Sequence, residues 1–430
     1  MHNTEIAPLT GAIIPSESFG VALRIHYATF FSLMGGWIFD ALDATIYAYA
    51  VPGIMTDMKV SLAQAFSVVS VFFLCAAIGG VAMGSLCDKV GRKPVVMLSI
   101  ALYGIFNFLC GTAHSIGGLY LYRGLVGLSL GGLWPATMSL LSEIWPAKTR
   151  GAAVGILHSG WSIGMFISAA FAYFLIPIYG WRGMFYATAV PAALTFFAIA
   201  FFAKESPVWL ESRKLKRQTP STTSDTMPLI KLLNKKNLKT AMLGLGVSAF
   251  GQFGWWVLFT FLPTYMDRTL KLGITKGAEF MIWTSIGALA GYCSFGYLSD
   301  LYGRRIVFAS FCIGMALMIP VFIFSVTHSG LAYLPFVGLV LGYSTGYYGG
   351  YGALYAEMFA TDIRATGISF CQNMGRLAIF AGPLLIPYLI PRIGFKQSIG
   401  VASLSLVIAA VLVMLLKETR GINITAQDES

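Results

Sequence analysis

Two carboxylates, Asp40 and Asp43, lie inside a long apolar stretch near the start of the chain, residues 25–51. Their spacing of three residues places both on one face if this stretch is a helix. A carboxylate in hydrocarbon is costly while charged, so burial favours its protonated form. Such a group binds a proton where water reaches it and is neutral where water is excluded. Asp40 and Asp43 are therefore candidate proton carriers, unless they only form hydrogen bonds between packed helices.

One arginine, Arg376, lies about eleven residues into another apolar stretch, which is close to mid-membrane at ~1.5 Å of helix rise per residue. An arginine there costs about 2.5–3.5 kcal/mol on insertion scales. Its guanidinium stays charged and binds carboxylates through two parallel hydrogen bonds. We therefore predict that Arg376 binds a carboxylate of a solute. The alternative is that it statically neutralises a buried acid such as Asp40.

Several polar and aromatic side chains in apolar stretches are further candidates for contact with a solute. Tyrosines recur every four residues from Tyr343 to Tyr355, with glycines between them that permit close helix approach. This stripe lines either a cavity or a helix interface, and Tyr347 and Tyr351 are its candidate ligands. His158 is of a residue type that titrates near neutral pH, although packing histidines are at least as common. The other candidates are Gln252, Trp255, Gln372 and Asn373.

The composition excludes a soluble protein. The chain has 430 residues, of which 57% are hydrophobic and only 11% are charged, whereas soluble domains carry about 25% charged residues. Uncharged runs near the ~20 residues of a spanning helix recur along the whole chain. We predict an all-α membrane protein with twelve transmembrane helices, at 25–51, 63–87, 94–113, 117–142, 150–178, 183–203, 240–266, 279–299, 306–327, 331–359, 365–390 and 397–416.

One long polar stretch, residues 204–239, divides the chain into two halves. It separates an N-terminal six-helix bundle at 1–203 from a C-terminal one at 240–416, which is followed by a tail at 417–430. Most of the 29 Lys and Arg residues fall on the same side as this stretch, and positive loops stay in the cytoplasm. The sequence therefore predicts a multi-pass protein of the plasma (inner) membrane with a cytoplasmic central loop and cytoplasmic termini. The net charge of +11 reflects this bias rather than nucleic-acid binding, and the six cysteines lack metal-ligand spacing.

The two halves repeat each other in sequence. A G-x3-D-x2-G-R-[KR] loop begins at Gly84 and again at Gly296, and a Glu and an Arg seven residues apart occur in both halves. The tripeptide at 204–206, Lys-Glu-Ser, is echoed by Lys-Glu-Thr at 417–419. Matches in the same order at nearly one offset imply two pseudo-symmetric six-helix bundles with a site at the midplane between them.

These motifs resemble those of the major facilitator superfamily, a group of membrane transporters. The G-x3-D-x2-G-R-[KR] loop is similar to the superfamily signature, and residues 204–210 are similar to the Pro-Glu-Ser-Pro-x-Trp-Leu segment after its sixth helix. The resemblance covers essentially the whole chain and implies the twelve-helix major facilitator fold. Asp40-Ala-Leu-Asp43 and Asn373-Met-Gly-Arg376 resemble segments of the aromatic-acid/proton symporters, and the sialate and lactate proton symporters share much of this pattern.

The resemblance also implies roles for individual residues. Asp43 resembles the proton-binding Asp of proton-coupled sugar porters, and Arg123 resembles the fourth-helix Arg that pairs with it. A long cation near a helix end can instead reach the lipid headgroups. The charges of the repeated motifs resemble the superfamily's cytoplasmic charge relay, which implies a gate of salt bridges that break when the bundles rock. The predicted gating residues are Gly84, Asp88, Gly91, Arg92, Glu143, Arg150, Asp300, Gly303, Arg304, Glu357 and Arg364.

These observations favour a secondary active transporter that imports a small organic anion together with a proton by alternating access. The anion would be a monocarboxylate, an aromatic acid or a sugar acid, and the protein would function as a monomer in the bilayer. No cofactor or metal is expected, because the proton gradient supplies the energy. The sequence has no H-E-x-x-H, G-x-S-x-G or P-loop motif, which argues against an enzyme and against ATP-driven pumping. The alternatives are a proton-coupled sugar or polyol porter, which leaves Arg376 unexplained, and a drug/proton antiporter.

Overall fold

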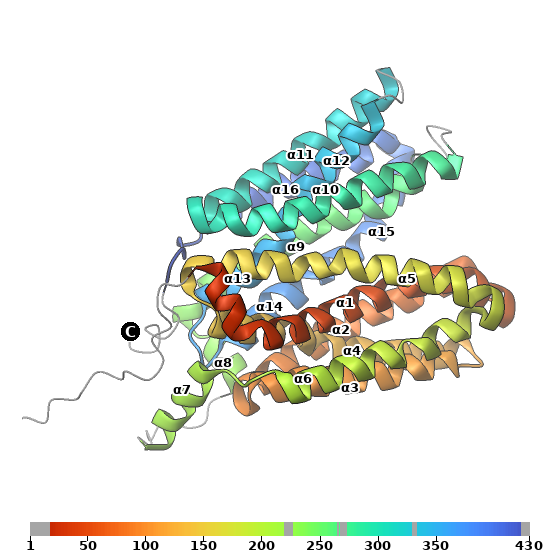
Figure 1. Cartoon of the computed structure of the whole chain (residues 1–430). Helices are drawn as coiled ribbons and strands as arrows, with labels where there is room; N and C mark the ends of the chain where they lie inside the picture. The colour runs from red at the N-terminus through yellow and green to blue at the C-terminus, as the bar shows by residue number, and fades with distance from the viewer. Residues whose placement is uncertain (1–17, 219–226, 265, 267–272, 329–332, 423–430) are drawn as a thin grey trace, which may run out of the picture.

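A computed structural model of the chain describes residues 18–218, 227–264, 266, 273–328 and 333–422. Every regular element within these ranges is a helix, and the long helices run side by side (Figure 1). Eight helices of the described residues are long and apolar enough to cross a membrane. The all-α membrane architecture predicted from the sequence is confirmed.

The first bundle has six spanning segments. Its helices are α1 (Phe19–Met58), α2 (Leu62–Val90), α3 (Arg92–Gly111), α4 (Ile116–Ile144), α5 (Arg150–Ala187) and α6 (Ala189–Phe202), with the short 3-10 turn η1 (Ala147–Thr149) before α5. Within the bundle, α1 packs along α5, and α4 lies between α2 and α3. The helical path of α5 is broken at Gly180, whose φ of 64° and ψ of −170° are non-helical, and the chain then returns through α6.

The second bundle also has six spanning segments, two of which are interrupted. Its elements are α9 (Lys235–Thr264), α10 (Gly273–Tyr302), α11 (Arg304–His328), α12 (Leu334–Ser344), η4 (Thr345–Gly350), α13 (Tyr351–Met358), α14 (Arg364–Gly375), α15 (Leu377–Ile393) and α16 (Phe395–Met414). The tenth span runs through α12, η4 and α13, where the glycine-rich tyrosine stripe winds as a 3-10 helix. The eleventh span is α14 plus α15, and Arg376 is the residue between them.

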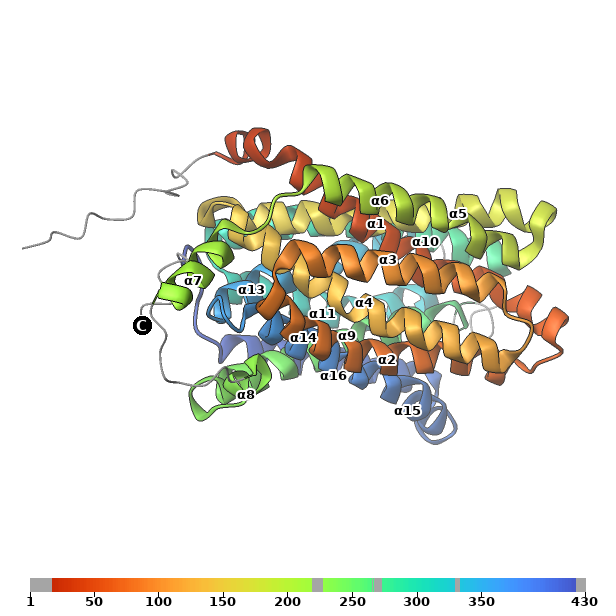
Figure 2. The same ribbon diagram turned by 90° about the horizontal axis from the view of Figure 1, so that it is seen from below.

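The central polar stretch carries two short helices, α7 (Pro207–Gln218) and α8 (Pro228–Leu232). Both lie at the end of the molecule where the C-terminal chain lies (Figures 1 and 2). Trp209 fixes α7 there, since its indole nitrogen donates to the carbonyl of Asp88 at 3.0 Å. Residues 219–224, which the sequence indicates are a flexible part of this stretch, lie outside the described residues.

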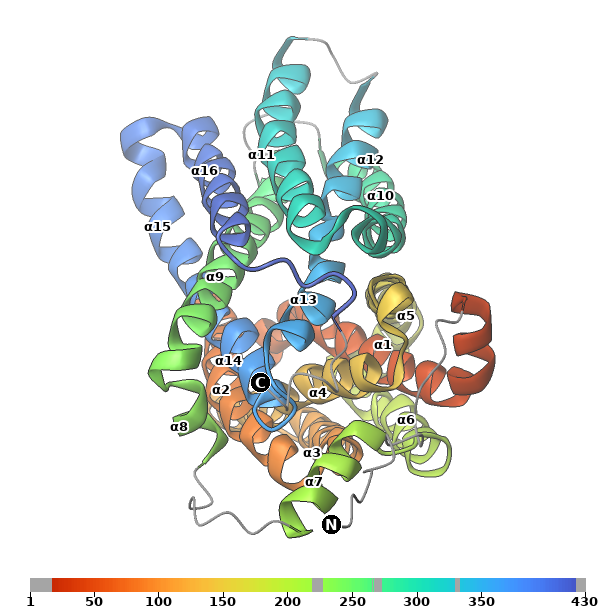
Figure 3. The same ribbon diagram turned by 90° about the vertical axis from the view of Figure 1, so that its left-hand side faces the viewer.

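The two bundles meet along two pairs of helices. On one side α14 packs against α2 and α4, and on the other side α10 packs against α5 (Figure 3). The bundles lie close together at the end that carries α7 and α8 and diverge toward the opposite end (Figure 1).

The distribution of side chains is that of a protein embedded in lipid. Large apolar side chains face outward, for example Phe201, Ile178 and Leu194, which are 77%, 71% and 68% exposed. Charged side chains lie inside, where Asp40 and Asp43 are 2% and 0% exposed. Because hydrocarbon offers no hydrogen bonds, buried polar groups must be satisfied within the bundle. The partners of the interior charges therefore show which of them the fold itself uses.

Candidate functional site

Asp43 is held in a hydrogen-bonded cluster inside the first bundle. Its carboxylate accepts from Nη1 of Arg123 at 2.8 and 3.0 Å and from the hydroxyl of Tyr103 at 2.8 Å. The same Nη1 lies 3.3 Å from Oδ1 of Asn107, whose amide nitrogen donates to the Thr188 hydroxyl at 3.0 Å. The predicted pair of Asp43 and Arg123 is thus present, and α1, α3, α4 and the α5–α6 junction all contribute to it.

Arg123 is enclosed rather than directed to the membrane surface. It is only 2% exposed, and its guanidinium carbon lies 4.9 Å from the ring centre of Phe72 and 5.1 Å from that of Tyr47. A cation over aromatic faces gains attraction that partly replaces water. The alternative of a headgroup anchor is therefore wrong for Arg123.

Asp40 lies one helical turn before Asp43 but has a different environment. Its closest polar contact is the Tyr103 hydroxyl at 3.4 Å, which is longer than the bond from the same hydroxyl to Asp43. A hydroxyl has one proton to donate, so Tyr103 serves Asp43 first. Asp40 is buried, and no Lys or Arg nitrogen lies within 4.0 Å of its oxygens in the described part of the chain.

Arg376 is the cation that faces Asp40 from the second bundle. The two side chains interact electrostatically across the bundle interface, and the ring of Tyr348 also lies within the electrostatic range of Arg376. Within the described residues, the guanidinium makes no hydrogen bond and no ion pair closer than 4.0 Å. In this conformation Arg376 is therefore not a tight static partner of Asp40. Arg376 retains donors that a carboxylate from solution could use.

Aromatic side chains of several helices pack around Tyr348, which interacts with Arg376. The Trp255 ring of α9 lies 5.4 Å from Tyr348 of η4 and 5.1 Å from Trp256. Tyr348 in turn lies 6.3 Å from His158 of α5, whose ring lies 4.9 Å from Trp37 of α1. These rings provide flat apolar walls, and the buried indole nitrogen of Trp255 has no hydrogen-bond partner among the described atoms. The arrangement suits a small solute with a planar body.

His158 lies inside this aromatic group and not on the protein surface. It is 4% exposed, packs edge-on against Tyr292 at 5.0 Å, and its buried Nδ1 has no hydrogen-bond partner among the described atoms. A buried imidazole without a partner is costly. His158 therefore stays a candidate for contact with a solute, which is the role predicted from the sequence.

Three polar candidates of the second bundle are used in helix packing. Gln252 donates to the backbone carbonyl of Gln372 at 3.0 Å, and the Gln372 side chain accepts from Ser248 at 3.1 Å. Asn373 donates to the carbonyl of Gly131 at 3.1 Å, which joins α14 to α4 of the other bundle. Because these amides are engaged by neighbouring helices, the prediction that Gln252, Gln372 and Asn373 bind the solute is not supported by their contacts.

The tyrosine stripe is a packing surface as well. Tyr347 and Tyr351 are 0% exposed, and their hydroxyls donate to the α9 carbonyls of Gly251 at 2.9 Å and of Val247 at 3.5 Å. Both hydroxyls are therefore used in packing against α9 in this conformation. That Tyr347 and Tyr351 bind the solute stays a prediction, which their contacts do not support. The neighbouring Tyr348, which the four-residue spacing passed over, faces the aromatic walls instead.

The first half-gate consists of Asp88, Arg92 and Glu143 together with Arg364 from the other bundle. Arg92 grips Glu143 with Nε at 3.0 Å and Nη2 at 2.8 Å, and Arg364 reaches the same carboxylate at 2.5 Å. Asp88 accepts from the backbone nitrogens of Ala365 at 3.1 Å and of residue 366 at 2.8 Å. All four charged side chains are fully buried.

The second half-gate repeats this arrangement with Asp300, Arg304 and Glu357 together with Arg150 from the first bundle. Arg304 contacts Glu357 at 3.0 and 3.1 Å, and Arg150 reaches the same carboxylate at 3.0 Å. Asp300 accepts from the backbone nitrogens at 151 and 152 at 3.0 and 2.8 Å. The charged residues predicted from the repeats thus form ion pairs that join the two bundles at the end carrying α7 and α8.

Glycine is needed in the repeated motif for two separate physical reasons. A Cβ on Gly84 would lie 2.7 Å from the Cβ of Ser369, so its absence lets α2 and α14 touch. Gly91 and Gly303 take φ values of 117° and 103°, a region that side chains strongly disfavour. They allow α3 and α11 to start immediately after α2 and α10, which directs Arg92 and Arg304 inward.

Two carboxylates that the sequence analysis did not assign complete the half-gates. Glu205 accepts from the backbone nitrogens of Arg92 at 3.0 Å and Lys93 at 3.2 Å, and Glu418 accepts from those of Arg304 at 2.8 Å and Arg305 at 3.2 Å. Each therefore caps the N-terminus of α3 or α11, where unpaired N–H groups favour a negative charge. The repeat of Lys-Glu-Ser and Lys-Glu-Thr was the signal that could have identified them.

Glu418 has a perturbed acidity as a result. Burial alone would raise the pKa of Glu418, but the backbone N–H groups that donate to its carboxylate hold the pKa below its usual range.

Tyr103 and Asn107 are the other residues that sequence reasoning missed. They are polar and four residues apart in the apolar helix α3, which was the available signal.

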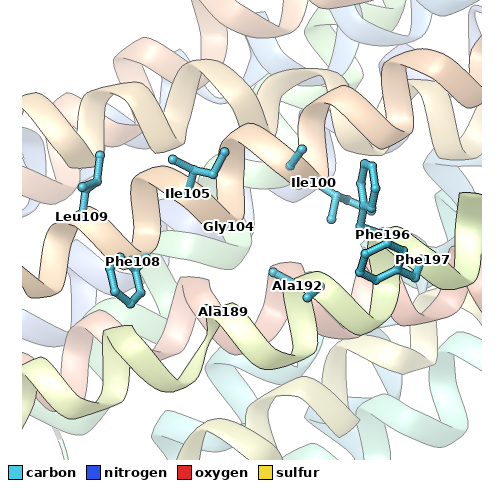
Figure 4. A pocket seen from close by; sticks show the side chains of 11 residues that line it. Ile100, Gly104, Ile105, Phe108, Leu109, Ala189, Ala192, Phe196 and Phe197 are labelled. Carbon is cyan, nitrogen blue, oxygen red and sulfur yellow. The ribbon is translucent and has the colours of Figure 1, made fainter.

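A separate pocket lies away from these charges, between α3 and α6 (Figure 4). Its volume is about 360 Å³, and its lining is apolar, with Gly104, Phe108, Ala192 and Phe196 among its residues. None of the candidate residues lines it, and it offers no donor or charge for an anion. Within the described residues there is also no group of three or more His, Cys, Asp or Glu that could hold a metal ion.

Relatives with known names share nearly the whole length of this chain. The cis,cis-muconate transport protein of Acinetobacter baylyi is 29% identical over 352 residues, which cover 81% of this chain and 84% of that protein. The niacin transporter NiaP of the same organism is 29% identical over 426 residues, which cover 93% of this chain and 95% of that protein. Both are named as transporters.

The fold is shared with solved transporters. The proton:xylose symporter XylE bound to 6-bromo-6-deoxy-D-glucose superposes with a TM-score of 0.77 at 19% identity, over 94% of this chain and 99% of that chain. The sequence model described as Sugar (and other) transporter matches residues 211–430, and the model described as Major Facilitator Superfamily matches residues 33–295. The latter match covers more than half of the chain, so the protein belongs to the major facilitator superfamily and is a membrane transporter rather than an enzyme.

Proposed function

We propose that this protein is a symporter that carries a small organic anion and a proton into the cell by alternating access. The observation that carries this proposal is Arg376, a mid-span arginine with no hydrogen-bond or ion-pair partner among the described residues. A permanently charged guanidinium inside a bilayer is costly unless it performs a task. Binding the carboxylate of a solute is the task that its chemistry fits best.

The neighbours of Arg376 support a carboxylate with a compact, planar body. Tyr348 lies within the electrostatic range of the guanidinium, Trp255 packs against Tyr348 at 5.4 Å, and the buried Nδ1 of His158 on the opposite bundle has no hydrogen-bond partner among the described atoms. The relatives named for muconate and niacin are consistent with this choice, since both compounds carry carboxylates. The proton would bind Asp43 or Asp40, which lie across the interface from Arg376.

The two half-gates support a rocking mechanism. In this conformation they close one end of the interface, which is the end that carries the central stretch and the C-terminal chain. We place that end in the cytoplasm of a cell whose inner membrane holds the protein as a monomer. Solute and proton would then enter from outside, and the ion pairs at Glu143 and Glu357 would break as the bundles rock to release both inside.

Uptake into proteoliposomes tests the proposal. The measurement uses radiolabelled lactate, benzoate-type acids and sialate under an imposed inward proton gradient. The native protein is compared with Arg376→Ala. Arg392→Ala is the matched control, because Arg392 is an exposed arginine of the same span. We expect gradient-driven uptake of an acid by the native protein and the control, and its loss in Arg376→Ala, because the carboxylate loses its charged partner.

A proton-coupled sugar porter is the second candidate, and the pair of Asp43 and Arg123 is the observation that favours it. This second candidate function gives no role to Arg376. Transport of xylose or another sugar in place of every acid, with Arg376→Ala still active, would overturn the anion proposal and make Arg376 structural.

A further inference from the structure

Four formal charges lie deep within the membrane-spanning helices of the described residues. They are two acids and two bases, Asp40, Asp43, Arg123 and Arg376, so the interior is neutral when all four are ionised. A net charge is costly to carry through a low-dielectric interior. The neutrality of this set therefore limits which loaded forms of the protein can change conformation easily.

The two acids are not equivalent in this set. Asp43 accepts from Arg123 at 2.8 and 3.0 Å and from Tyr103 at 2.8 Å. Protonating it would leave the guanidinium of Arg123 without its anion at a site that is 2% exposed. Asp40 has only the longer contact to Tyr103 at 3.4 Å, and protonating it breaks no ion pair within 4.0 Å.

The surroundings of Asp40 leave Arg376 as its counter-charge. The nearest charged group on the same helix is Asp43, and the nearest titratable group on α3 is Tyr103. The charged residue on α4 is Arg123, which is paired with Asp43. The titratable residue on α5 is His158, which packs next to Trp37. The helix α6 carries no charged or histidine side chain, and α2 carries charges only in its last turn. Arg376 is thus the cation whose charge Asp40 balances across the interface.

Resting on the function proposed above, we propose that Asp40 is the proton site and that Asp40 and the carboxylate of the solute alternate as the counter-charge of Arg376. In the empty protein, ionised Asp40 balances Arg376. In the loaded protein, protonated Asp40 is neutral and the carboxylate of the solute balances Arg376. Both forms have a neutral interior, so both can rock.

The partly loaded forms differ from these two. A proton alone leaves the interior with one excess positive charge, and an anion alone leaves it with one excess negative charge. Either form must carry a buried net charge to change conformation, which is slow. One proton therefore accompanies each carboxylate, and the transport of a monocarboxylate moves no net charge across the membrane.

Tyr103 is the positioning residue of this exchange. Its hydroxyl proton is directed to Asp43, so its oxygen can accept a hydrogen bond from protonated Asp40 on the other side. A proton on Asp40 thus has an acceptor ready, while the pair of Asp43 and Arg123 is undisturbed. We expect Tyr103→Phe to shift the pH at which accumulation is half-maximal downward, because the protonated form of Asp40 loses this acceptor.

The decisive measurement is the charge moved per solute in proteoliposomes with the native protein. It uses the best-transported monocarboxylate, and it compares a proton gradient without membrane potential with a potassium–valinomycin potential at equal pH. A pH-sensitive dye reports the protons that enter. We expect accumulation with the proton gradient, no change of initial rate with the potential, and about one proton per carboxylate.

Variants of the two acids separate their roles. Asp40→Asn should lose accumulation by at least tenfold but keep exchange of internal for external acid, and this exchange should no longer depend on pH. Asp43→Asn should lose both activities, because it leaves Arg123 unpaired. Asp57→Asn is the matched control, since Asp57 is a partly exposed acid at the end of the same helix and pairs with Arg182. It should leave both activities unchanged.

Several outcomes would overturn the proposal. Acceleration by the potential, a ratio clearly different from one, or gradient-driven accumulation by Asp40→Asn would each do so. If Asp40→Asn proves inactive in exchange as well, two measurements on the native protein still test the proposal. They are the number of protons per carboxylate and the effect of the membrane potential on the initial rate of uptake. Failure of the native protein to carry any acid would instead overturn the proposed function.

Discussion

The gate is built twice, and the two half-gates hold the opposite bundle with different numbers of donors. In the first half-gate, Asp88 accepts from two backbone nitrogens of α14 and also from the hydroxyl of Thr366 at 2.8 Å. In the second, Asp300 accepts from the two equivalent nitrogens of α5 but from no hydroxyl, because the residue that corresponds to Thr366 is Ala152.

Burial follows the same trend. The side chains of Asp88 and Arg92 are 0% exposed, whereas those of Asp300 and Arg304 are 8% and 2% exposed. The Thr419 hydroxyl donates to Glu357 at 2.8 Å, and Ser206 interacts with Glu143 at the corresponding place of the first half-gate. One motif therefore produces a drier contact with one more hydrogen bond to α14 and a slightly wetter contact with α5.

The largest effect is expected at the shared carboxylates. Glu143→Gln leaves the buried guanidiniums of Arg92 and Arg364 without their anion, and breaking a buried ion pair costs about 3–5 kcal/mol. The closed state should therefore be lost. Alkylation of Cys87, which is 0% exposed next to the first half-gate, should rise sharply when it is followed by mass spectrometry. Glu357→Gln should match it, because Glu357 also holds two arginines, and an inert Glu357→Gln would contradict the symmetry.

An intermediate effect is expected at the two aspartates, and here the half-gates should differ. Asp88→Asn weakens three accepted hydrogen bonds and the contact to Arg92 at 3.2 Å, which we expect to cost about 1–3 kcal/mol of closed-state stability. Asp300→Asn should cost less of the contact between the bundles, because Asp300 accepts two rather than three hydrogen bonds from the opposite bundle, and its bond from Arg304 at 2.5 Å lies within its own bundle. Equal alkylation rates of Cys87 in the two variants would show that the third donor contributes nothing.

A smaller effect follows from exchanging the residue that distinguishes the half-gates. Thr366→Ala removes one hydrogen bond to Asp88 and should destabilise the closed state by about 0.5–1.5 kcal/mol. Ala152→Thr offers Asp300 a hydroxyl and should stabilise the closed state by a similar amount. The double variant should return the alkylation of Cys87 to the native rate, provided that the two sites act independently. A double variant as labile as Thr366→Ala would rule out the hydroxyl as the difference.

The smallest effect concerns acidity at the start of α11. The pKa of Glu418 is lower in the folded protein than in the unfolded chain, so its carboxylate stabilises the fold above about pH 4.3. This contribution is lost as the pH falls through the lower folded pKa. The thermal unfolding midpoint of the native protein should therefore fall more between pH 5 and pH 3 than that of Glu418→Gln. Parallel curves would show that the cap adds no stability.

Much of the gate follows from the sequence, because its information is local and repeated. A charged motif at the end of an apolar run must lie at a membrane surface, and its second copy must lie at the same surface of the other bundle. Salt bridges among the charged residues of the repeats were predicted on that basis, but the pairing of Arg364 with Glu143 was not. The caps Glu205 and Glu418 were not, since each meets the start of a helix more than 100 residues away in the chain.

The centre of the protein was less predictable. Tyr347, Tyr351 and Asn373 have the residue types and depth expected of ligands, yet neighbouring helices use their polar groups. Which face of a membrane helix meets a cavity depends on its rotation, and hydropathy does not encode rotation when all sides of the helix are apolar. Tyr348, which lies in η4, packs against Trp255 and His158 instead.

The sequence by itself determined that this chain spans a membrane in two similar halves, because hydrophobic length and repeated motifs are properties of short segments. It also determined that two acids and an arginine lie in the interior. Only the tertiary structure distinguishes the surroundings of Asp40 from those of Asp43, since the two share one helix face and one sequence context. The difference arises because α4 brings Arg123 to Asp43, while Asp40 faces Arg376 across the interface.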